Sequence, residues 1–375
     1  MTEETRERWQ AARRVLCVRL DTIGDVLMTG PAIRGLKEQR ADRRVSLLTS
    51  RAGAAAGRLL PGVDEVIVYD PPWMKATAPR ADPGPDLRLA GALRERGFDA
   101  AAIFTVYSQS PLPAALLLHL AGVPRRLAHC RENPYALLTD WLPEREPHEL
   151  VRHEVRRQLD LVAAVGAAPA DELLAVELPE AARAAAASAL VEAGVDRSRL
   201  WLVVHPGASA PSRRYPLEAW AHACRALAGE HGVQLVLTGD SGDVALVESL
   251  RARVGAPAAS LAGRLDLAGL AALLEAAPLL LAGNTGPVHV AAAVGTPVVD
   301  LYALTNPQHA PWGVPARVLF EDVPCRWCYK SVCPEGHHDC LRRVAPERVA
   351  DAALELLRDG RAAGRPAGLP YPAPG

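Results

Sequence analysis

Short apolar runs alternate with amphipathic stretches along most of the chain. RRVLCVRL (13–20) and VSLLTS (45–50) have the composition of buried strands, and residues 24–40 repeat apolar side chains at helical spacing. An alternation of this kind predicts a parallel β-sheet with helices on both of its faces. The pattern fades near Gly166 and starts again at Leu200. The sequence therefore predicts an α/β protein with two Rossmann-like, doubly wound domains.

The break in the pattern sets the expected domain boundaries. We expect an N-terminal domain over 1–168, a linker over 169–180 and a C-terminal domain over 181–345. A closing helix should follow over 346–358, before a Pro-, Gly- and Ala-rich tail over 359–375 that we expect to be disordered. Ligands of open α/β sheets bind at the carboxyl ends of the strands. We therefore expect loops from both domains to face one cleft.

Composition and charge narrow the class of protein. Apolar residues make up 49% of the 375 positions and charged residues 23%, which is typical of a globular protein in water. The net charge of −1 argues against nucleic acid as a partner, since such surfaces are strongly basic. The charged N-terminus lacks a signal core, and the longest apolar run (114–123) is too short to span a bilayer. We expect a cytoplasmic protein, with attachment to the cytoplasmic face of the membrane as an alternative.

A small-residue turn at Gly283–Gly286 stands between a predicted strand and a helix that Pro287 opens. Free backbone N–H groups and the helix dipole make such a turn a seat for a phosphate group. Three polar residues would surround that seat: Asn284, Thr285 and His289. An ordinary strand–turn–helix unit without a ligand is the alternative.

A second loop, HPGASAPSRRYP (205–216), follows the first strand of the C-terminal half. It combines a small-residue turn with two arginines, whose guanidinium groups suit a diphosphate. Its candidate binding residues are His205, Gly207, Ser209, Arg213 and Arg214. A solvated basic loop is the alternative interpretation.

The loop after the first strand, RLDTIGDVLMTGPA (19–32), carries Asp21, Gly24 and Asp25. Two carboxylates at a sheet edge can serve as a general base and a positioning group, although either could instead cap the following helix. The loop lacks the three-glycine dinucleotide fingerprint. The chain also has no Walker lysine and no G-x-S-x-G nucleophile elbow.

Four cysteines stand close together near the C-terminus, with spacing C-x2-C-x4-C-x6-C: Cys325, Cys328, Cys333 and Cys340. Four thiolates at short spacing suit a structural zinc ion. An iron–sulfur cluster would use the same ligands, but nothing else in the chain indicates electron transfer. A loop of unligated cysteines is the third interpretation.

Taken in their order along the chain, the loops at 19–32, 205–216 and 283–286 and the cysteine run resemble glycosyltransferase family 9, the ADP-heptose:lipopolysaccharide heptosyltransferases and their relatives. The similarity extends from about Val15 to Leu357. The resemblance implies the GT-B fold, in which two Rossmann-like domains face each other across a cleft and the C-terminal half binds most of the donor. It also implies an inverting transfer that requires no metal or other cofactor.

The family's functional positions can be carried over residue by residue. Its Gly-Asp pair falls on Gly24 and Asp25, which implies that Asp25 is the general base. Its basic residue ahead of the aromatic-Pro pair, usually Lys, falls on Arg213. Its D-T/S-G-x-x-H pattern falls on Asn284, Thr285, Gly286 and His289. Asn replaces the usual Asp that touches the donor sugar, so the identity of that sugar stays open.

We therefore predict a glycosyltransferase that moves a sugar, with heptose from an ADP-sugar favoured, to a hydroxyl group of a cell-envelope glycan or lipid-linked acceptor. A transferase acting on a specialised metabolite and a nucleotide-sugar epimerase on the same fold are the alternatives. The presence of Asp25 argues against a non-catalytic binding module.

Overall fold

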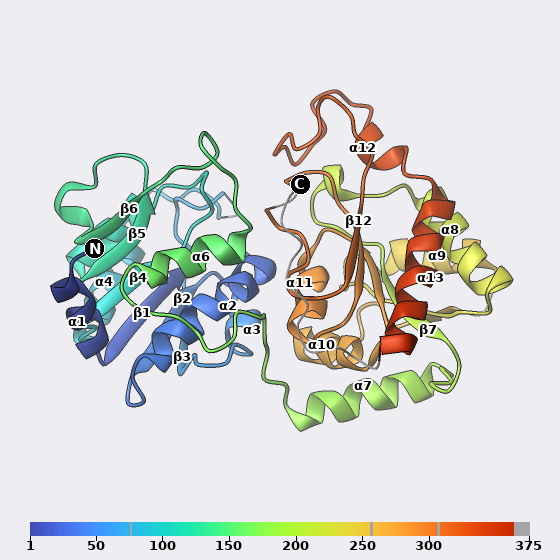
Figure 1. Cartoon of the computed structure of the whole chain (residues 1–375), viewed down its shortest axis with the longest axis horizontal. Coiled ribbons are helices and arrows are strands. Elements are labelled where there is room, and N and C mark those ends of the chain that lie inside the picture. Colours follow the sequence, from blue (N-terminus) through green and yellow to red (C-terminus); the bar gives the residue numbers. More distant parts are fainter. Residues whose placement is uncertain (76, 256–257, 306–307, 364–375) are drawn as a thin grey trace. The chain divides into compact units, whose positions relative to one another are not determined.

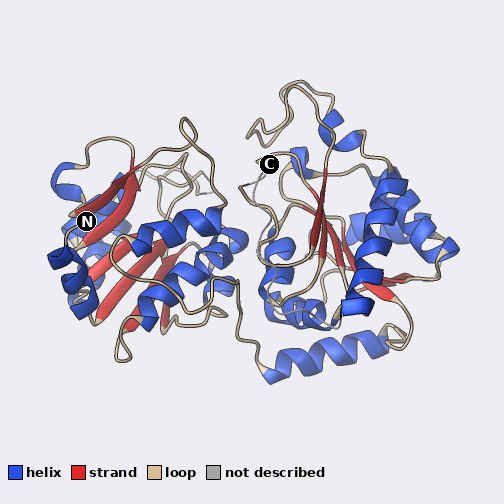
Figure 2. Cartoon of the chain, viewed as in Figure 1, coloured by secondary structure: helices blue, strands red, loops and turns tan. Residues whose placement is uncertain are grey.

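The computed structural model describes residues 1–75, 77–255, 258–305 and 308–363. The chain divides into two compact units: unit 1 is Met1–Ala175, and unit 2 begins at Val176. Each unit contains one parallel sheet with helices on both faces (Figure 1; Figure 2). The predicted fold class, α/β with two doubly wound parallel sheets, is confirmed.

Unit 1 contains six strands in the order β3-β2-β1-β4-β5-β6. The strands are β1 (Arg14–Arg19), β2 (Arg44–Thr49), β3 (Glu65–Val68), β4 (Ala100–Ile103), β5 (Arg126–Cys130) and β6 (Asp140–Pro143). The helices are α1 (Glu3–Ala11), α2 (Ile23–Glu38), α3 (Ala54–Gly57), α4 (Gly84–Arg96), α5 (Leu112–Leu120) and α6 (Glu154–Ala163). Side chains alternate across β1, so that Leu16 and Val18 join the core under α4 and α5, while Arg19 faces α2 and α6.

Unit 2 contains six strands in the order β12-β11-β10-β7-β8-β9. The strands are β7 (Trp201–His205), β8 (Gln234–Leu237), β9 (Ala258–Ser260), β10 (Leu280–Gly283), β11 (Val298–Leu301) and β12 (Ala316–Leu319). The longer helices are α7 (Glu180–Glu192), α8 (Leu217–Arg225), α9 (Val244–Val254), α10 (Leu267–Ala276), α11 (Gly286–Ala293) and α13 (Pro346–Ala363), and α12 (Asp339–Arg342) is short.

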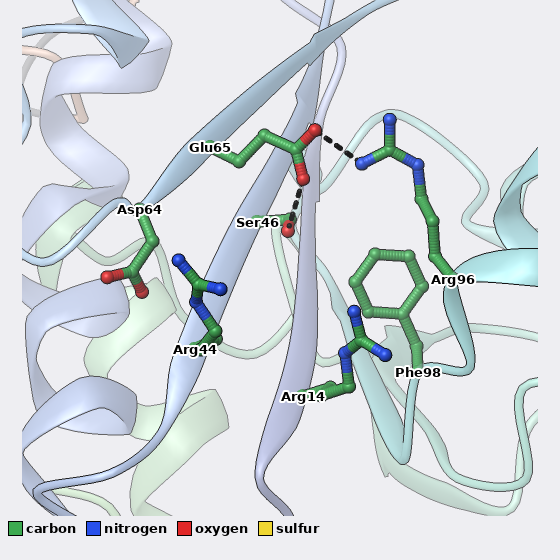
Figure 3. Close-up of a pocket in the computed structure, with 7 residues that line it drawn as sticks. All are labelled: Arg14, Arg44, Ser46, Asp64, Glu65, Arg96 and Phe98. Carbon is green, nitrogen blue, oxygen red and sulfur yellow. Dashed lines mark hydrogen bonds and ion pairs between the residues drawn. The ribbon is translucent and has the colours of Figure 1, made fainter.

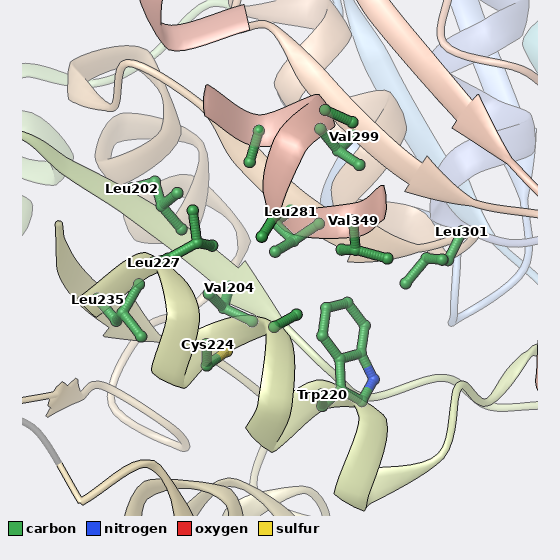
Figure 4. Packing of buried hydrophobic residues seen from close by; sticks show 14 of the residues in the cluster. Leu202, Val204, Trp220, Cys224, Leu227, Leu235, Leu281, Val299, Leu301 and Val349 are labelled. Atoms are coloured by element: carbon green, nitrogen blue, oxygen red, sulfur yellow. The ribbon is translucent and has the colours of Figure 1, made fainter. Parts of the chain in front are cut away.

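The core of unit 2 lies between its sheet and helices α8, α9 and α13. Leu202, Val204, Val299 and Leu301 point from the strands toward Trp220 and its neighbours (Figure 4). Residues at the alternate strand positions therefore face the opposite side, where α10 and α11 pack. Asp300 lies on that second side of β11, between Val299 and Leu301.

Both units have the same strand order when each is numbered from its own first strand, 3-2-1-4-5-6. This order has a switch point between the first and fourth strands, where ligands of doubly wound folds bind. The switch points lie between β1 and β4 in unit 1 and between β7 and β10 in unit 2. Each predicted functional loop follows one of these strands.

The structure corrects the sequence-based prediction at the C-terminus. Helix α13 extends to Ala363, so residues 359–363 are helical and do not belong to a disordered tail. The rest of the predicted tail, 364–375, lies outside the described residues. The hydrophobic pattern also missed several elements: α1, α7, β5, β6 and β12. Helix α7 is rich in alanine, and its weakly amphipathic pattern offers little periodic signal.

Candidate active site

A fully buried arginine organises the loop after β1 in unit 1. The Arg19 guanidinium forms ion pairs with Asp21 (2.9 Å), Asp25 (3.1 Å) and Glu154 of α6 (2.8 Å). Burial by itself lowers the pKa of Arg19, but the three carboxylates outweigh that effect and raise it above its ordinary value. Arg19 and Glu154 were not among the sequence predictions, because nothing in the local sequence shows that α6 returns to this strand.

Asp25 has two structural roles at the start of α2. One oxygen, Oδ2, accepts hydrogen bonds from the backbone N–H (3.1 Å) and hydroxyl (2.9 Å) of Thr22, in the manner of a capping box. The other oxygen, Oδ1, accepts from Arg19 (3.1 Å). The capping interpretation of Asp25 is therefore confirmed. A structural role of this kind and a role as general base do not exclude each other.

Asp21 faces a pocket at the same sheet edge. Its Oδ1 accepts a hydrogen bond from Gln109, in the loop after β4, at 2.6 Å. Burial raises the pKa of Asp21 to about 6, with Asp25 adding to that effect and Arg19 opposing it. A carboxylate with this pKa titrates closer to neutral pH than an exposed aspartate and is better suited to accept a proton.

The pocket beside Asp21 has a volume of about 310 Å³ and lies wholly within unit 1. Polar groups from the loops after β1, β3 and β4 line it together with aromatic side chains. The lining residues include Asp21, Trp73, Lys75, Phe104, Ser108, Gln109 and Ser110. A mixture of aromatic faces and hydroxyl, amide and charged groups suits a sugar with an anionic substituent.

The two predicted phosphate loops of unit 2 approach each other closely. A side chain added at Gly283 would place its Cβ 3.1 Å from the backbone oxygen of Arg213. A glycine at this position therefore lets the loop after β7 lie against the turn after β10. At Gly207, an added Cβ would lie 2.2 Å from a carboxylate oxygen of Asp243, so a larger residue there would displace the Asp243 side chain.

The polar groups of this site have few internal partners. The Arg213 guanidinium makes no hydrogen bond or ion pair with any described residue, and its Nε is buried. The backbone N–H groups of Thr285 and Gly286, at the start of α11, likewise donate to no described residue. A cation and free N–H groups at a helix N-terminus form a binding site for an anion such as a phosphate.

Asn284 connects this turn to a buried carboxylate on the neighbouring strand. Its Nδ2 donates to Asp300 Oδ2 (3.3 Å) and to the backbone oxygen of His309 (3.1 Å). Asp300 is fully buried, and its Oδ1 has no hydrogen-bond partner among the described residues. Burial raises the pKa of Asp300 to about 7, while Asn284 and Arg213 act in the opposite direction. The sequence pattern did not single out Asp300, which lies within an otherwise apolar strand.

The remaining predicted residues surround the site in different ways. His205 is buried, with Nδ1 3.1 Å from the Thr238 hydroxyl, and burial lowers its pKa, which keeps it neutral. Arg214 is exposed and donates through Nε to the backbone oxygen of Ala208 (3.0 Å), so it braces its own loop. Ser209 is exposed on that loop, while Gly24 in α2 and His289 in α11 are buried.

The cysteine segment, 325–340, lies against the loops after β7 and β11 of unit 2. Ser212 N–H donates to Ser331 O (3.1 Å), and Trp327 N–H donates to Ala303 O (3.0 Å). Burial, reinforced by the other three thiols, raises the pKa of Cys340 to about 11. Within the part of the chain that the structure describes, no group of three or more His, Cys, Asp or Glu residues is arranged to hold a metal ion. The hydrogen bond from Ser212 shows that the segment contacts the loop that carries Arg213.

A different pocket, also of about 310 Å³, lies at the opposite edge of the unit 1 sheet. Figure 3 shows Arg14, Arg44 and Phe98 around it, and Glu65 bound to Ser46 and Arg96. These residues come from the amino ends of β1–β3 and the end of α4. The switch points of the sheets lie at the other edge, so this pocket is not part of the candidate site.

Comparison with known proteins identifies the family to which the chain belongs. Residues 87–338 match the description "Glycosyltransferase family 9 (heptosyltransferase)". The match covers more than half of the chain, and the chain therefore belongs to glycosyltransferase family 9. It is 25% identical to lipopolysaccharide heptosyltransferase 2 of Salmonella typhimurium, over 92% of this chain and 99% of that protein.

Solved structures support the same fold. A family 9 glycosyl transferase from Veillonella parvula DSM 2008 superposes with a TM-score of 0.76 and 22% identity, over 92% of this chain and 97% of that one. E. coli heptosyltransferase WaaC with ADP-2-deoxy-2-fluoro heptose superposes with a TM-score of 0.61 and 19% identity, over 92% and 99% of the two chains. No helix among the described residues is long and apolar enough to cross a membrane.

Proposed function

We propose that this glycosyltransferase moves heptose from ADP-heptose to a sugar hydroxyl of a lipopolysaccharide core, with inversion at the transferred carbon and without a catalytic metal. The observation that carries the proposal is the anion site of unit 2. There the loop that carries Arg213 lies against the turn before α11, and the Arg213 guanidinium and the N–H groups of Thr285 and Gly286 have no partner among the described residues.

The choice of donor rests on the relatives. The lipopolysaccharide heptosyltransferase 2 of Salmonella typhimurium aligns with nearly the whole chain, and WaaC was solved with an ADP-heptose analogue. A diphosphate carries two anionic groups, which suits a guanidinium on one side and helix N–H groups on the other. The same groups would stabilise the ADP that leaves, as charge develops on its terminal phosphate in the transition state.

The acceptor is assigned to unit 1. The pocket beside Asp21 offers aromatic surface and hydrogen-bonding groups, and Lys75 suits a phosphate or carboxylate on the acceptor glycan. Asp25 is proposed as the general base that takes the proton of the attacking hydroxyl. Asp21, which faces the pocket, is proposed to position that hydroxyl. Arg19 holds both carboxylates on one guanidinium, which fixes their mutual geometry.

We further propose an attachment to the cytoplasmic face of the membrane, because the acceptor of the Salmonella relative is a lipopolysaccharide. The protein should sediment together with vesicles that contain the lipopolysaccharide acceptor, and should stay in solution with vesicles that lack it.

Structural zinc at the four cysteines is a separate proposal with a direct test. Metal analysis of untagged protein should find about one equivalent of zinc per chain. If no zinc is found, the interpretation as a loop of unligated cysteines holds instead.

The decisive experiment combines the protein with ADP-heptose and a heptose-deficient lipopolysaccharide. Release of ADP, together with heptosylated acceptor of opposite anomeric configuration, is the expected result. Activity should persist after treatment with a chelator, and activity that needs an added divalent ion would overturn the metal-independent mechanism. Interconversion of free nucleotide sugars without release of ADP would instead identify an epimerase. Product formed only with another nucleotide sugar or another acceptor would overturn the assigned substrates.

A further inference from the structure

The pair formed by Asn284 and Asp300 is the feature of unit 2 that the proposed function leaves unexplained. In the family pattern that this chain resembles, Asp stands at the position of Asn284. Here a carboxylate stands instead on the adjacent strand, where Ala282 of β10 pairs with Asp300 of β11. A carboxyl group is therefore present beside the turn, but it stands on the neighbouring strand β11 and is fully buried.

We propose that Asp300 is a positioning residue that fixes the orientation of the Asn284 amide, so that its carbonyl oxygen accepts a hydrogen bond from a hydroxyl group of the donor sugar. This inference rests on the proposed function, since it assumes that Asn284 contacts the sugar of an ADP-sugar. Asn284 then supplies an uncharged hydrogen-bond acceptor, its amide oxygen, and Asp300 keeps that oxygen in place.

The hydrogen bonds of the amide support this assignment. An asparagine Nδ2 carries two hydrogens, and here both are directed inward, to Asp300 Oδ2 (3.3 Å) and to the backbone oxygen of His309 (3.1 Å). The amide group is planar, so Oδ1 points away from these partners. It accepts no hydrogen bond from the described residues. The atom of Asn284 that remains for a ligand is therefore Oδ1, a hydrogen-bond acceptor.

Asp300 determines this polarity in its ionised form, because a carboxylate can only accept hydrogen bonds. A rotated amide would place its oxygen against the carboxylate oxygen and lose both inward bonds. Burial raises the pKa of Asp300, whereas the hydrogen bond from Asn284 and the positive charge of Arg213 favour the ionised form. The uncharged amide oxygen of Asn284 also avoids the repulsion that a carboxylate at position 284 would exert on a nearby diphosphate.

Three variants test the proposal by titration calorimetry with two probes, ADP and ADP-heptose, without acceptor. In Asp300→Asn, two amides face each other and the orientation is no longer enforced. We expect ADP-heptose to bind about tenfold more weakly, the loss of roughly one hydrogen bond, with ADP binding unchanged within about twofold. Asn284→Ala should show the same selective loss, and adding Asp300→Asn to it should cause no further loss.

The double variant Asn284→Asp with Asp300→Asn exchanges the two side chains. It restores one amide–carboxylate hydrogen bond and keeps an oxygen directed toward the ligand. We expect ADP-heptose binding within about threefold of the wild type, the residual reflecting the charge now at position 284. Thermal unfolding of each variant provides the control for folding, and the exchange keeps the test available if Asp300→Asn alone does not fold.

Equal weakening of ADP and ADP-heptose in Asp300→Asn would overturn the proposal, because it would show a purely structural role. Unchanged binding of both ligands would overturn it as well, and so would an exchange variant that folds but still loses ADP-heptose selectively. Failure of the proposed function is distinguishable from these results, since the wild type itself would then not bind ADP-heptose.

Discussion

The two units share one strand order but differ in whether the arginine near the switch point has ion-pair partners. In unit 1, Arg19 at the end of β1 is surrounded by Asp21, Asp25 and Glu154, so that cation and carboxylates are internally paired. In unit 2, Arg213 follows β7 and has no ion pair among the described residues. Paired charges hold a geometry, whereas an unpaired cation beside free N–H groups is prepared for an anionic ligand.

This comparison separates two kinds of functional residue. If unit 1 supplies the proton acceptor and unit 2 the diphosphate site, changes in unit 1 should alter turnover or stability while ADP binding persists. Changes in unit 2 should alter ADP binding itself. The following variants test that division, from the largest expected effect to the smallest.

Asp25→Asn should lower kcat by about 10²- to 10⁴-fold, the usual contribution of a general base, and leave ADP affinity unchanged. The amide oxygen can still accept hydrogen bonds from Thr22, so the start of α2 should persist. Steady-state turnover and ADP calorimetry provide the two measurements. Asp21→Asn is the matched variant and should mainly raise KM for the acceptor. If Asp21→Asn lost turnover and Asp25→Asn did not, the base would have to be Asp21.

Arg19→Met should destabilise unit 1 by about 3–5 kcal/mol, because three carboxylates would lose their shared buried cation. Denaturant unfolding measures this loss. Arg8→Met is the matched control, since Arg8 pairs with Glu4 on an exposed helix surface and should contribute less than about 1 kcal/mol. Equal losses of unfolding free energy in the two variants would show that the buried cluster stabilises the protein no more than an exposed ion pair does.

Arg213→Ala should weaken ADP binding by about 10- to 100-fold, the loss of charge-assisted hydrogen bonds to phosphate. The neighbouring Arg214→Ala should weaken it less, because the Arg214 side chain is exposed and braces the backbone of Ala208. Calorimetry with ADP compares the two variants directly. A larger effect at Arg214 would reverse the assignment of these two arginines.

The pH dependence of stability should report the burial of Asp21. Its pKa in the folded protein is about 6, above the value of an exposed aspartate, so the folded state binds this proton more tightly than the unfolded state. This contribution to stability is fully present below about pH 4 and is lost as pH rises through 6. Unfolding free energies measured from pH 4 to 7 should therefore fall less with rising pH in Asp21→Asn than in the wild type. Parallel curves would contradict the assigned shift.

Gly283→Ala should have the smallest effect, about a threefold loss of ADP affinity, through pressure of the new methyl group on the Arg213 backbone. Gly229→Ala is the control in the same unit, because an added Cβ there meets nothing within 4 Å. It should leave ADP affinity unchanged. Equal affinities of the two variants would show that the loop after β7 can move without loss of the anion site.

The amino-acid sequence by itself determined the fold class and the position of the loops. Strand and helix periodicities are local, and strand ends in a doubly wound sheet define where ligands bind, so these patterns located the loops that carry Asp25, Arg213 and Asn284. The roles of single residues within those loops came from the family resemblance and stay predictions. Weakly periodic elements such as α7 escaped that reasoning. Only the tertiary structure brought Glu154 to Arg19 and Asp300 to Asn284, because these pairs join residues from separate elements. Contacts of this kind depend on packing and burial, which no local spacing encodes, and here they decide which charges are paired and which remain for a ligand.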